Sequence, residues 1–542
     1  MQPKAAKSCA PAGVTNKRAL EAFGIRFRTA SEEAEVAVPP HPTNGDEERY
    51  KDKCGTYSKC IKQAGRGLVD QDAFKKFRAA LGSVDGKIRG SADFESVPLG
   101  GNRPLNGPLA AFAFTLAGTD SEQFGAPLVP KAPALASKEY ATELVELYWA
   151  SLLRDVPFTG YETNQTAIDA ARELSGLAAY AGPRDEQGLV TPRLLFRGGG
   201  KFGDPNGHEK EWFQGESIGP YISQFCIQPT NLGAQSIDQR MQTSAPNVDY
   251  MTDWVTWQAV QNGLSTGLQL QPGDTNPYLH DGRGLSTFTH QDELFQAYFI
   301  AYLVMNTLGI PKNPKNPYAS FTHQQPFGTF GGPDISATLA AAARAALNAV
   351  WYQKWIVHLR HRPESGGGIV EMMKTGKHGV EGQLDKVVLE SNAVDRSFQK
   401  HGSHFLSQAF PEGSPAHPAY PTGHGTVAGA CITVLKFFYD GKALVPNPKV
   451  PSHDGLSLGP YAYAGQDAGL MTVNGELHKL AHNISFGHGI HAGIHWRSDT
   501  DYSIRLGEAV ALSFLRDQAL TYRETVSVDL TTVDGSTVTI SN

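Results

Sequence analysis

A long alanine-rich segment at residues 335–359 constrains the fold of this chain more than any other feature. It reads ISATLAAAARAALNAVWYQKWIVHL, and alanine is the residue that favours helix most strongly. Several other stretches repeat apolar residues at intervals of three and four, the spacing of a helix with one buried face. These stretches lie at 15–35, 70–82, 138–157, 163–182, 249–262, 290–309, 424–439 and 505–517. The chain is therefore predicted to be mainly α, built from packed helical bundles.

The two ends of the chain differ from this helical region. Residues 1–135 are rich in proline, glycine and short polar runs, so we expect an N-terminal arm that wraps a helical domain at 136–542. Near the C-terminus, SVDLTTVDGSTVTI alternates around an Asp-Gly pair, which predicts a small β-hairpin at 525–541. Helix–strand alternation and a glycine-rich phosphate loop are both missing, which argues against a nucleotide-binding sheet.

Charge and hydropathy exclude several kinds of partner. The net charge is −6, from 48 basic and 54 acidic residues, whereas nucleic acids and anionic membranes bind basic surfaces. The longest apolar stretch, 295–310, contains Gln296 and Asn306 and is shorter than the roughly 20 residues that span a bilayer. We therefore expect a buried helix there, with no membrane span and no nucleic-acid partner.

The N-terminus and the cysteines leave the compartment open. MQPKAAKSCAPAG has no apolar segment of the kind found in secretory signals, so a soluble cytoplasmic protein is the default expectation. The chain has five cysteines. A Cys54–Cys60 disulfide is one reading, but a reduced protein is the simpler one.

The first chemical motif is WYQKWIVHLRHRPE, at the end of the alanine-rich segment. It carries Lys354 and Arg362, and Pro363 is expected to end the helix. Eight helical residues would separate the two cations by roughly 12 Å along the axis. Two long side chains can still converge on one anion over that span, and the arginine fork suits an oxyanion. Taken alone, two basic residues at a helix end more often just favour the helix dipole.

A sharper motif is SPAHPAYPTGHGTVAGACITVLKFF. Prolines keep the approach extended, and a helix is expected to begin at about Gly423 with Thr422 as its N-cap. The first amides of such a helix point at any anion placed before them, and the helix dipole favours negative charge there. His424 lies in the first turn, where it can exchange a proton or hydrogen bond with that anion. The alternative is a purely structural helix cap, followed by a histidine without a functional role.

The third motif is HKLAHNISFGHGIHAGIHWRSDTDY. His491 and His495 have i, i+4 spacing, which on a helix places two imidazoles on one face and with His488 resembles a zinc site. No cysteine pair lies nearby, and no glutamate sits between the two histidines as in zinc proteases. A single histidine completing an anion site fits the pattern better than zinc does.

Together the three motifs resemble the signature of the vanadium haloperoxidase and type 2 phosphatidic acid phosphatase superfamily, Lys…Arg-Pro, Pro-Ser-Gly-His and Arg…His. Segments such as VPPHPTNGDEE, ELYWASLLRDVPF and VDYMTDWVTWQAVQNG extend the resemblance over most of the chain. They look like the bacterial and cyanobacterial members of the bromoperoxidase branch. The resemblance implies vanadate as cofactor (phosphate can take its place) and oxidation of bromide or iodide by hydrogen peroxide. It also implies small organic acceptors and a homodimer or larger homo-oligomer.

The resemblance also implies roles for individual residues. His495 would bond vanadium through a ring nitrogen, His424 would be the acid–base histidine, and Asp292 would orient it. The family position of His417 is histidine in algal bromoperoxidases and phenylalanine in fungal chloroperoxidases, which favours bromide or iodide over chloride. The residues expected to hold the vanadate oxygens are Lys354, Arg362, Thr422 and Gly423.

Two positions depart from the family pattern. Thr422 replaces the family serine and keeps its hydroxyl. Gly489 stands where the family has arginine, six residues before the metal-binding histidine. A shift of one residue would bring His488 into the arginine's place, and Arg497 is another candidate donor. Two other functions therefore stay open: an acid phosphatase with His495 as nucleophile, and a catalytically silent oxyanion-binding protein.

Overall fold

The structure is a computed structural model that describes residues 13, 15–82, 91–203, 209–377, 379–462 and 467–542. Cys9 lies outside these ranges. The four described cysteines, Cys54, Cys60, Cys226 and Cys431, are buried free thiols, so the Cys54–Cys60 disulfide does not form. Within the described part of the chain, every helix is too short or too polar to cross a bilayer.

Helices make up most of the regular structure, which confirms the predicted mainly α class. The α-helices are α1 (Lys17–Ala34), α2 (Asp46–Arg49), α3 (Gln71–Leu81), α4 (Ser91–Glu95), α5 (Lys138–Leu152), α6 (Gln165–Ser175), α7 (Trp254–Gln261), α8 (Gly282–Phe288), α9 (Gln296–Thr307), α10 (Gly332–Tyr352), α11 (Pro363–Thr375), α12 (Lys386–Leu389), α13 (Asn392–His401), α14 (Gly423–Phe438), α15 (Val473–His482), α16 (His488–Ala492) and α17 (Arg497–Ala519). Two π-helical segments are η7 (Gln353–His358) and η9 (Asn483–Gly487). Short 3-10 turns are η1 (Pro108–Phe112), η2 (Ser121–Gln123), η3 (Phe158–Gly160), η4 (Pro192–Leu194), η5 (Gln224–Cys226), η6 (Pro317–Ser320) and η8 (Asp467–Leu470).

The strands form small antiparallel pairs. They are β1 (Gln63–Gly65) with β2 (Leu68–Val69), β3 (Gly200–Gly203) with β4 (Glu209–Trp212), β5 (Thr230–Leu232) with β6 (Gln235–Ile237), β7 (Lys449–Pro451) with β8 (Leu458–Pro460), and β9 (Ser527–Thr531) with β10 (Thr537–Ser541). In the last pair Thr537 lies opposite Thr531 and Ser541 opposite Ser527, which confirms the predicted C-terminal hairpin.

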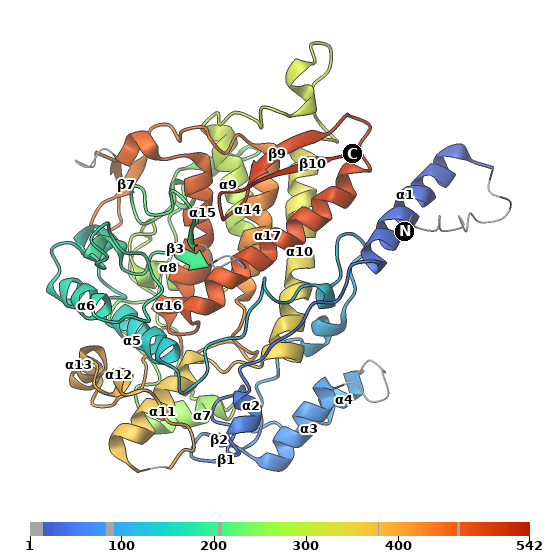
Figure 1. The fold of residues 1–542 in the computed structure, drawn as a ribbon. Coiled ribbons are helices and arrows are strands. Elements are labelled where there is room, and N and C mark those ends of the chain that lie inside the picture. Colours follow the sequence, from blue (N-terminus) through green and yellow to red (C-terminus); the bar gives the residue numbers. More distant parts are fainter. Residues whose placement is uncertain (1–12, 14, 83–90, 204–208, 378, 463–466) are drawn as a thin grey trace.

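The core of the molecule is formed by α10, α14 and α17 (Figure 1). α14 packs along α17 so closely that a Cβ on Gly429 would come within 1.9 Å of the Ile504 carbonyl oxygen. A Cβ on Gly507 would meet the Thr426 oxygen at the same distance. Every residue of α14 is buried except His424. The first turn of the most buried helix therefore presents one accessible side chain, a histidine.

The alanine-rich segment is not one continuous helix, and here the prediction was wrong. α10 ends at Tyr352, the chain widens into η7, and Leu359 turns it with a left-handed φ of 46°. Pro363 does not end a helix; it begins α11 at a position where its missing N–H costs nothing. Lys354 and Arg362 are therefore on opposite sides of a turn, and the 12 Å helical separation does not apply.

Part of the N-terminal region packs against η7 and the turn at Leu359. Tyr57, Phe77 and Trp355 share one buried aromatic cluster, and the Tyr57 amide donates to the Leu359 carbonyl. α1 is different: none of its residues is buried, and it projects away from the body (Figure 1). The division at residue 135 stays a prediction.

Candidate active site

Two buried cations lie directly behind the residues that line the site, and neither has an acidic partner among the described residues. The Lys354 ammonium donates to the carbonyl oxygens of Pro418 and Ala419, at 2.8 and 2.7 Å. Arg362 donates to the carbonyl oxygens of His417 and Ile494, at 2.9 and 3.0 Å. Their exposed fractions are 0% and 1%. Buried charges are normally paired with opposite charge, so the site is built to receive an anion.

Burial dominates the titration of these groups. Loss of solvation, followed by the charge of Arg362, lowers the pKa of Lys354 well below its usual range. Loss of solvation also lowers the pKa of Arg362 to about 10. The same cause holds the pKa values of the site imidazoles His417, His488 and His495 far below normal. The rings are therefore neutral at neutral pH, as metal ligands must be.

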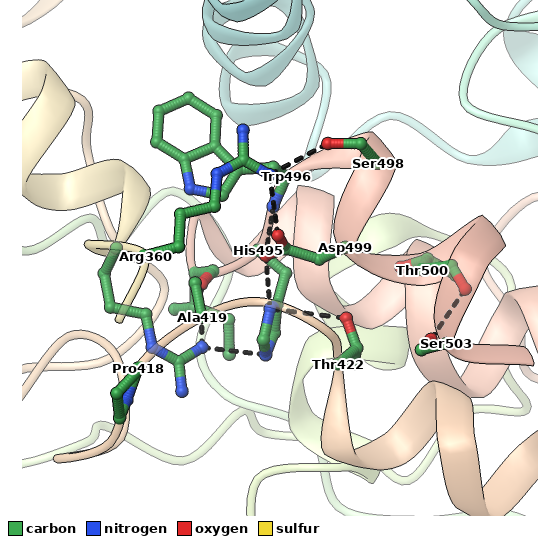
Figure 2. A network of polar contacts seen from close by, with 12 residues as sticks. Arg360, Pro418, Ala419, Thr422, His495, Trp496, Ser498, Asp499, Thr500 and Ser503 are labelled. Carbon is green, nitrogen blue, oxygen red and sulfur yellow. Dashed lines mark hydrogen bonds and ion pairs between the residues drawn. The ribbon is translucent and has the colours of Figure 1, made fainter. Parts of the chain in front are cut away.

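His495 is oriented by a buried carboxylate, as Figure 2 shows. Its Nδ1 lies 2.8 Å from Asp499 Oδ2, and the other Asp499 oxygen accepts from Arg360 at 2.7 Å. Arg360 in turn donates to Glu143 at 2.8 Å. Because Nδ1 donates its proton to Asp499, the lone pair is on Nε2, which lies 2.7 Å from Arg362. This carboxylate–histidine pair is the arrangement that fixes the tautomer of a metal-binding histidine.

The first turn of α14 supplies backbone donors. Thr422 occupies the N-cap position, as expected, but its side chain makes no capping hydrogen bond. Its hydroxyl instead lies 3.3 Å from Nδ1 of His495. Among the described residues, the amides of Gly423, His424 and Gly425 have no acceptor. These amides are the groups that an oxyanion at a helix N-terminus accepts from.

His424 and His417 lie on two walls of the site. Nε2 of His424 is 2.9 Å from Oδ1 of Asp292, and the second Asp292 oxygen is buried without a partner in the described structure. The His417 ring contacts Arg362 at 3.0 and 3.2 Å. Its other side lies against Trp351, with ring centroids 4.8 Å apart. The predicted acid–base pair and the predicted halide-position histidine therefore share one site.

His488 lies beside the two other histidines of the site. Its ring centroid is 4.6 Å from that of His424 and 6.3 Å from that of His495. It is 2% exposed, and neither ring nitrogen has a partner among the described residues. The π-helical segment η9 directly precedes it, and π-segments accommodate one extra residue in a helix.

Gly489 lies directly against His495. A Cβ at this position would lie 2.7 Å from Cβ of His495, and its carbonyl accepts from the amides of Ile494 and His495. Close backbone approach explains why glycine occupies the position where the family has arginine.

Two secondary ideas from the sequence do not hold. α16 ends at Ala492 and Gly493 turns the chain, so His491 and His495 do not share a helix face. The His491 ring lies against Phe158 and Phe196 instead. No three histidine, cysteine or acidic side chains of the described chain converge as metal ligands, which removes the zinc interpretation. Arg497 is also excluded as an anion donor, because its guanidinium is bound by Glu146.

A cavity of about 330 Å³ opens onto these groups. Its walls include six of the predicted residues: Asp292, His417, Gly423, His424, His488 and His495. Lys354, Arg362 and Thr422 do not line the cavity; they lie behind it, in contact with its lining or the adjacent backbone. Sequence reasoning missed other lining residues, among them Arg103, His290, Trp351, Phe410 and Glu412.

Asp499 is the most informative residue that was missed. The signal was present, since His495 and Asp499 are four residues apart in HWRSD. The spacing alone does not reveal that Trp496 begins the cap of α17 and turns both side chains toward each other. Arg103 had no such signal, because it reaches the cavity from a proline- and glycine-rich loop of the N-terminal region.

Comparisons with known proteins agree with this geometry. No protein-family profile matches the chain. The vanadium-dependent bromoperoxidase of Ascophyllum nodosum is 31% identical over 532 residues, covering 94% of this chain and 90% of the relative. That of Corallina pilulifera is 30% identical and covers 98% of this chain and 100% of the relative.

A solved structure gives the same result in three dimensions. It is the homohexameric second vanadate-dependent bromoperoxidase of Ascophyllum nodosum, which superposes with a TM-score of 0.87 at 27% identity. The match covers 100% of this chain and 94% of the other. On sequence and fold, this chain belongs to the vanadium-dependent bromoperoxidase family.

Proposed function

We propose that the protein binds vanadate and uses it to oxidise bromide or iodide with hydrogen peroxide, releasing hypohalous acid or an equivalent halogenating agent. The observation that carries the proposal is the pair of buried cations, Lys354 and Arg362, which lack an acidic partner among the described residues. An oxyanion beside His495 supplies the missing negative charge. Vanadate fits because it accepts hydrogen bonds through its oxygens and a neutral imidazole through its metal.

The residues present suit that group. Arg362 and Lys354 provide positive charge, and the amides at the start of α14 provide dipoles directed at the anion. The Thr422 hydroxyl is a further donor at the same helix end. His488 brings two unpartnered ring nitrogens and takes the part of the family arginine. Nε2 of His495 is the nitrogen left for the metal, because Nδ1 is engaged by Asp499.

Each residue then has a defined task in turnover. When bound, vanadate supplies a Lewis acid that polarises hydrogen peroxide for attack by halide. Lys354 and Arg362 hold the negative charge that accumulates on the oxygens. His424 takes a proton at Nδ1 when peroxide enters and returns it as the O–O bond breaks, while Asp292, bound to Nε2, keeps its ring oriented. His417, held by Arg362, keeps a polar wall on the halide side, in line with bromide or iodide rather than chloride.

The acid phosphatase alternative is not favoured, because the relatives described above are bromoperoxidases over nearly the whole length of this chain. The silent alternative rested on Gly489. The close approach of His495 requires glycine at position 489, and the His488 ring lies near that of His495. In this proposal His488 replaces the family arginine, so the anion site keeps a donor at that place.

A homo-oligomer also belongs to the proposal. The solved relative is a homohexamer, and α1 exposes all its side chains at least in part. We expect this projecting helix to pack against another copy of the chain.

One experiment separates the candidate functions. Bromide-dependent consumption of hydrogen peroxide is measured with and without added vanadate, next to hydrolysis of an aryl phosphate. We expect vanadate to switch on bromide oxidation. Vanadate that inhibits phosphate hydrolysis and produces no halogenation would establish the phosphatase instead, and neither activity would indicate the silent protein.

A further inference from the structure

A second, larger cavity of about 530 Å³ adjoins the site and has no role in the function proposed above. We call it the outer vestibule. The loop that follows α7 forms one wall, with Leu264, Leu268 and Leu270 as its apolar residues and Ser265, Thr266 and Gln269 as its polar ones. Leu264 and Leu268 are each 47% exposed, so both are open to contact with a molecule in the vestibule.

The vestibule and the inner cavity meet at three residues that line both: Arg103, His290 and Glu412. His290 is held in this shared wall by Glu412 through Nε2 and by stacking on Phe410, with ring centroids 3.9 Å apart. Leu270 packs on the same cluster as Phe410 and Ile494, and Ile494 lines the inner cavity. A molecule in the vestibule therefore rests against the wall behind which halide is oxidised.

Arg103 is the one lysine or arginine among the described residues that line these two cavities. It donates to the backbone carbonyls of Glu412 and Ser414, at 2.7 and 3.2 Å. These acceptors are neutral, and no ion pair of Arg103 is found among the described residues. The Glu412 carboxylate in the same wall is bound by His290; burial raises its pKa, but His290 and the charge of Arg103 lower it below its usual value. A guanidinium in this state favours a carboxylate, to which it can offer a fork of parallel donors.

We propose that the outer vestibule binds the organic halogen acceptor, and that this acceptor is an aromatic carboxylate whose acid group is held by Arg103. The leucines contact the ring, and the carboxylate directs the molecule to the shared wall. The inference rests on the proposed function, which supplies hypobromous acid from bromide, hydrogen peroxide and a proton. In the acceptor step the C–Br bond forms as the O–Br bond breaks, and the ring proton leaves with hydroxide as water.

A competition experiment tests the proposal on the vanadate-loaded protein. Equal amounts of 3-(4-hydroxyphenyl)propionate and its uncharged amide are brominated together, and the product ratio is compared with that given by reagent hypobromous acid. The two rings are alike, so free reagent discriminates little. We expect the protein to favour the acid roughly two- to fivefold more than the reagent does, the effect of one partly exposed ion pair.

Variants test whether the vestibule causes the preference for the acid. Arg103→Gln and Leu268→Asp should return the ratio to the reagent value, while Arg103→Lys should keep part of the preference. Leu232→Asp is the matched control, because Leu232 is 43% exposed and lies outside both cavities. A wild-type ratio equal to that of the reagent, or a preference that survives Arg103→Gln, overturns the proposal.

Binding without turnover separates this inference from the proposed function. Saturation-transfer NMR on the vanadate-free protein should show the acid bound through its ring protons, more strongly than the amide, and the signal should fall in Arg103→Gln. If bromide is not oxidised but the acid still binds, the proposed function fails and the vestibule stands. Equal signals for acid and amide would remove the assigned role of Arg103.

Discussion

At the residue scale, His488 shows how a missing side chain can be replaced by a neighbour. Its ring lies between those of His424 and His495 in the wall of the cavity, buried and without hydrogen-bond partners among the described residues. A buried polar group without a partner is costly, and an anion in the site removes that cost.

His488→Ala should therefore weaken vanadate binding. A hydrogen bond to a charged group contributes about 1.5–3 kcal/mol, so we expect a loss of roughly 10- to 100-fold in affinity. His488→Arg should bind at least as tightly as the wild type. Equilibrium dialysis against vanadate, or phosphate as its stand-in, measures both. Unchanged affinity in His488→Ala would show that the imidazole is only a packing residue.

Substitutions of His424 and Asp292 should lower the rate of bromide oxidation without lowering vanadate binding. We expect His424→Ala to retain vanadium and lose most bromide oxidation, because proton transfer contributes roughly 10²- to 10⁴-fold. Asp292→Asn should lower kcat by about 10-fold or more, as for other residues that orient an active group. Normal halogenation by His424→Ala would contradict its acid–base role.

At the scale of elements, the long helices could be predicted from the sequence and the interruptions could not. Apolar periodicity located α5 and α14 well, because these helices bury one face or more in the core, and alanine content located α10. Periodicity does not register a π-segment, in which one extra residue changes which side chains face inward. The turn at Leu359 was missed for this reason. The shift of His488 toward the site was expected only from comparison with the family motif, and η9 is the π-segment that directly precedes it.

The site was predictable to the extent that its motifs are local. Gly423 and His424 follow from one helix start. Arg103 and His290 reach the cavity through the packing of segments far apart in the sequence, which composition and spacing do not encode.

The crossing of α14 and α17 positions the donor amides, and its tight contact is testable. Gly429→Ala places a methyl against the Ile504 carbonyl, and overpacking of this kind costs about 1–3 kcal/mol. We expect a lower midpoint in urea denaturation. Gly24→Ala is the matched control, because Gly24 is also helical but has nothing within 4 Å of its Cβ position. Equal midpoints for the two variants would refute the close packing.

At the scale of the whole molecule, the helical core is buried within one chain, whereas α1 buries none of its residues against that chain. Phe23 and Phe27 stack on each other at 6.1 Å on this helix, and no residue of α1 is buried. Partly exposed aromatic side chains on a projecting helix are suited to an interface between subunits.

Replacing both phenylalanines by aspartate should therefore reduce the size of the assembly. Light scattering after size-exclusion chromatography should give the wild type a mass that is a multiple of the 58.5 kDa chain, and the Phe23→Asp/Phe27→Asp variant a smaller one. Phe327→Asp, at a position 73% exposed outside α1, serves as the control. An unchanged mass would exclude α1 from the interface.

The central claim is that the buried cations and His495 form a vanadate site that drives halide oxidation. Its most direct test is a titration of vanadium-free protein with vanadate, in which bound vanadium and the rate of bromide oxidation are measured together. We predict that the rate rises from background and levels off at one vanadium per chain. His323→Ala, an exposed histidine, should behave as the wild type, while His495→Ala should retain no vanadium. Full bromide oxidation without vanadium, or one bound vanadium per chain without bromide oxidation, would contradict the account.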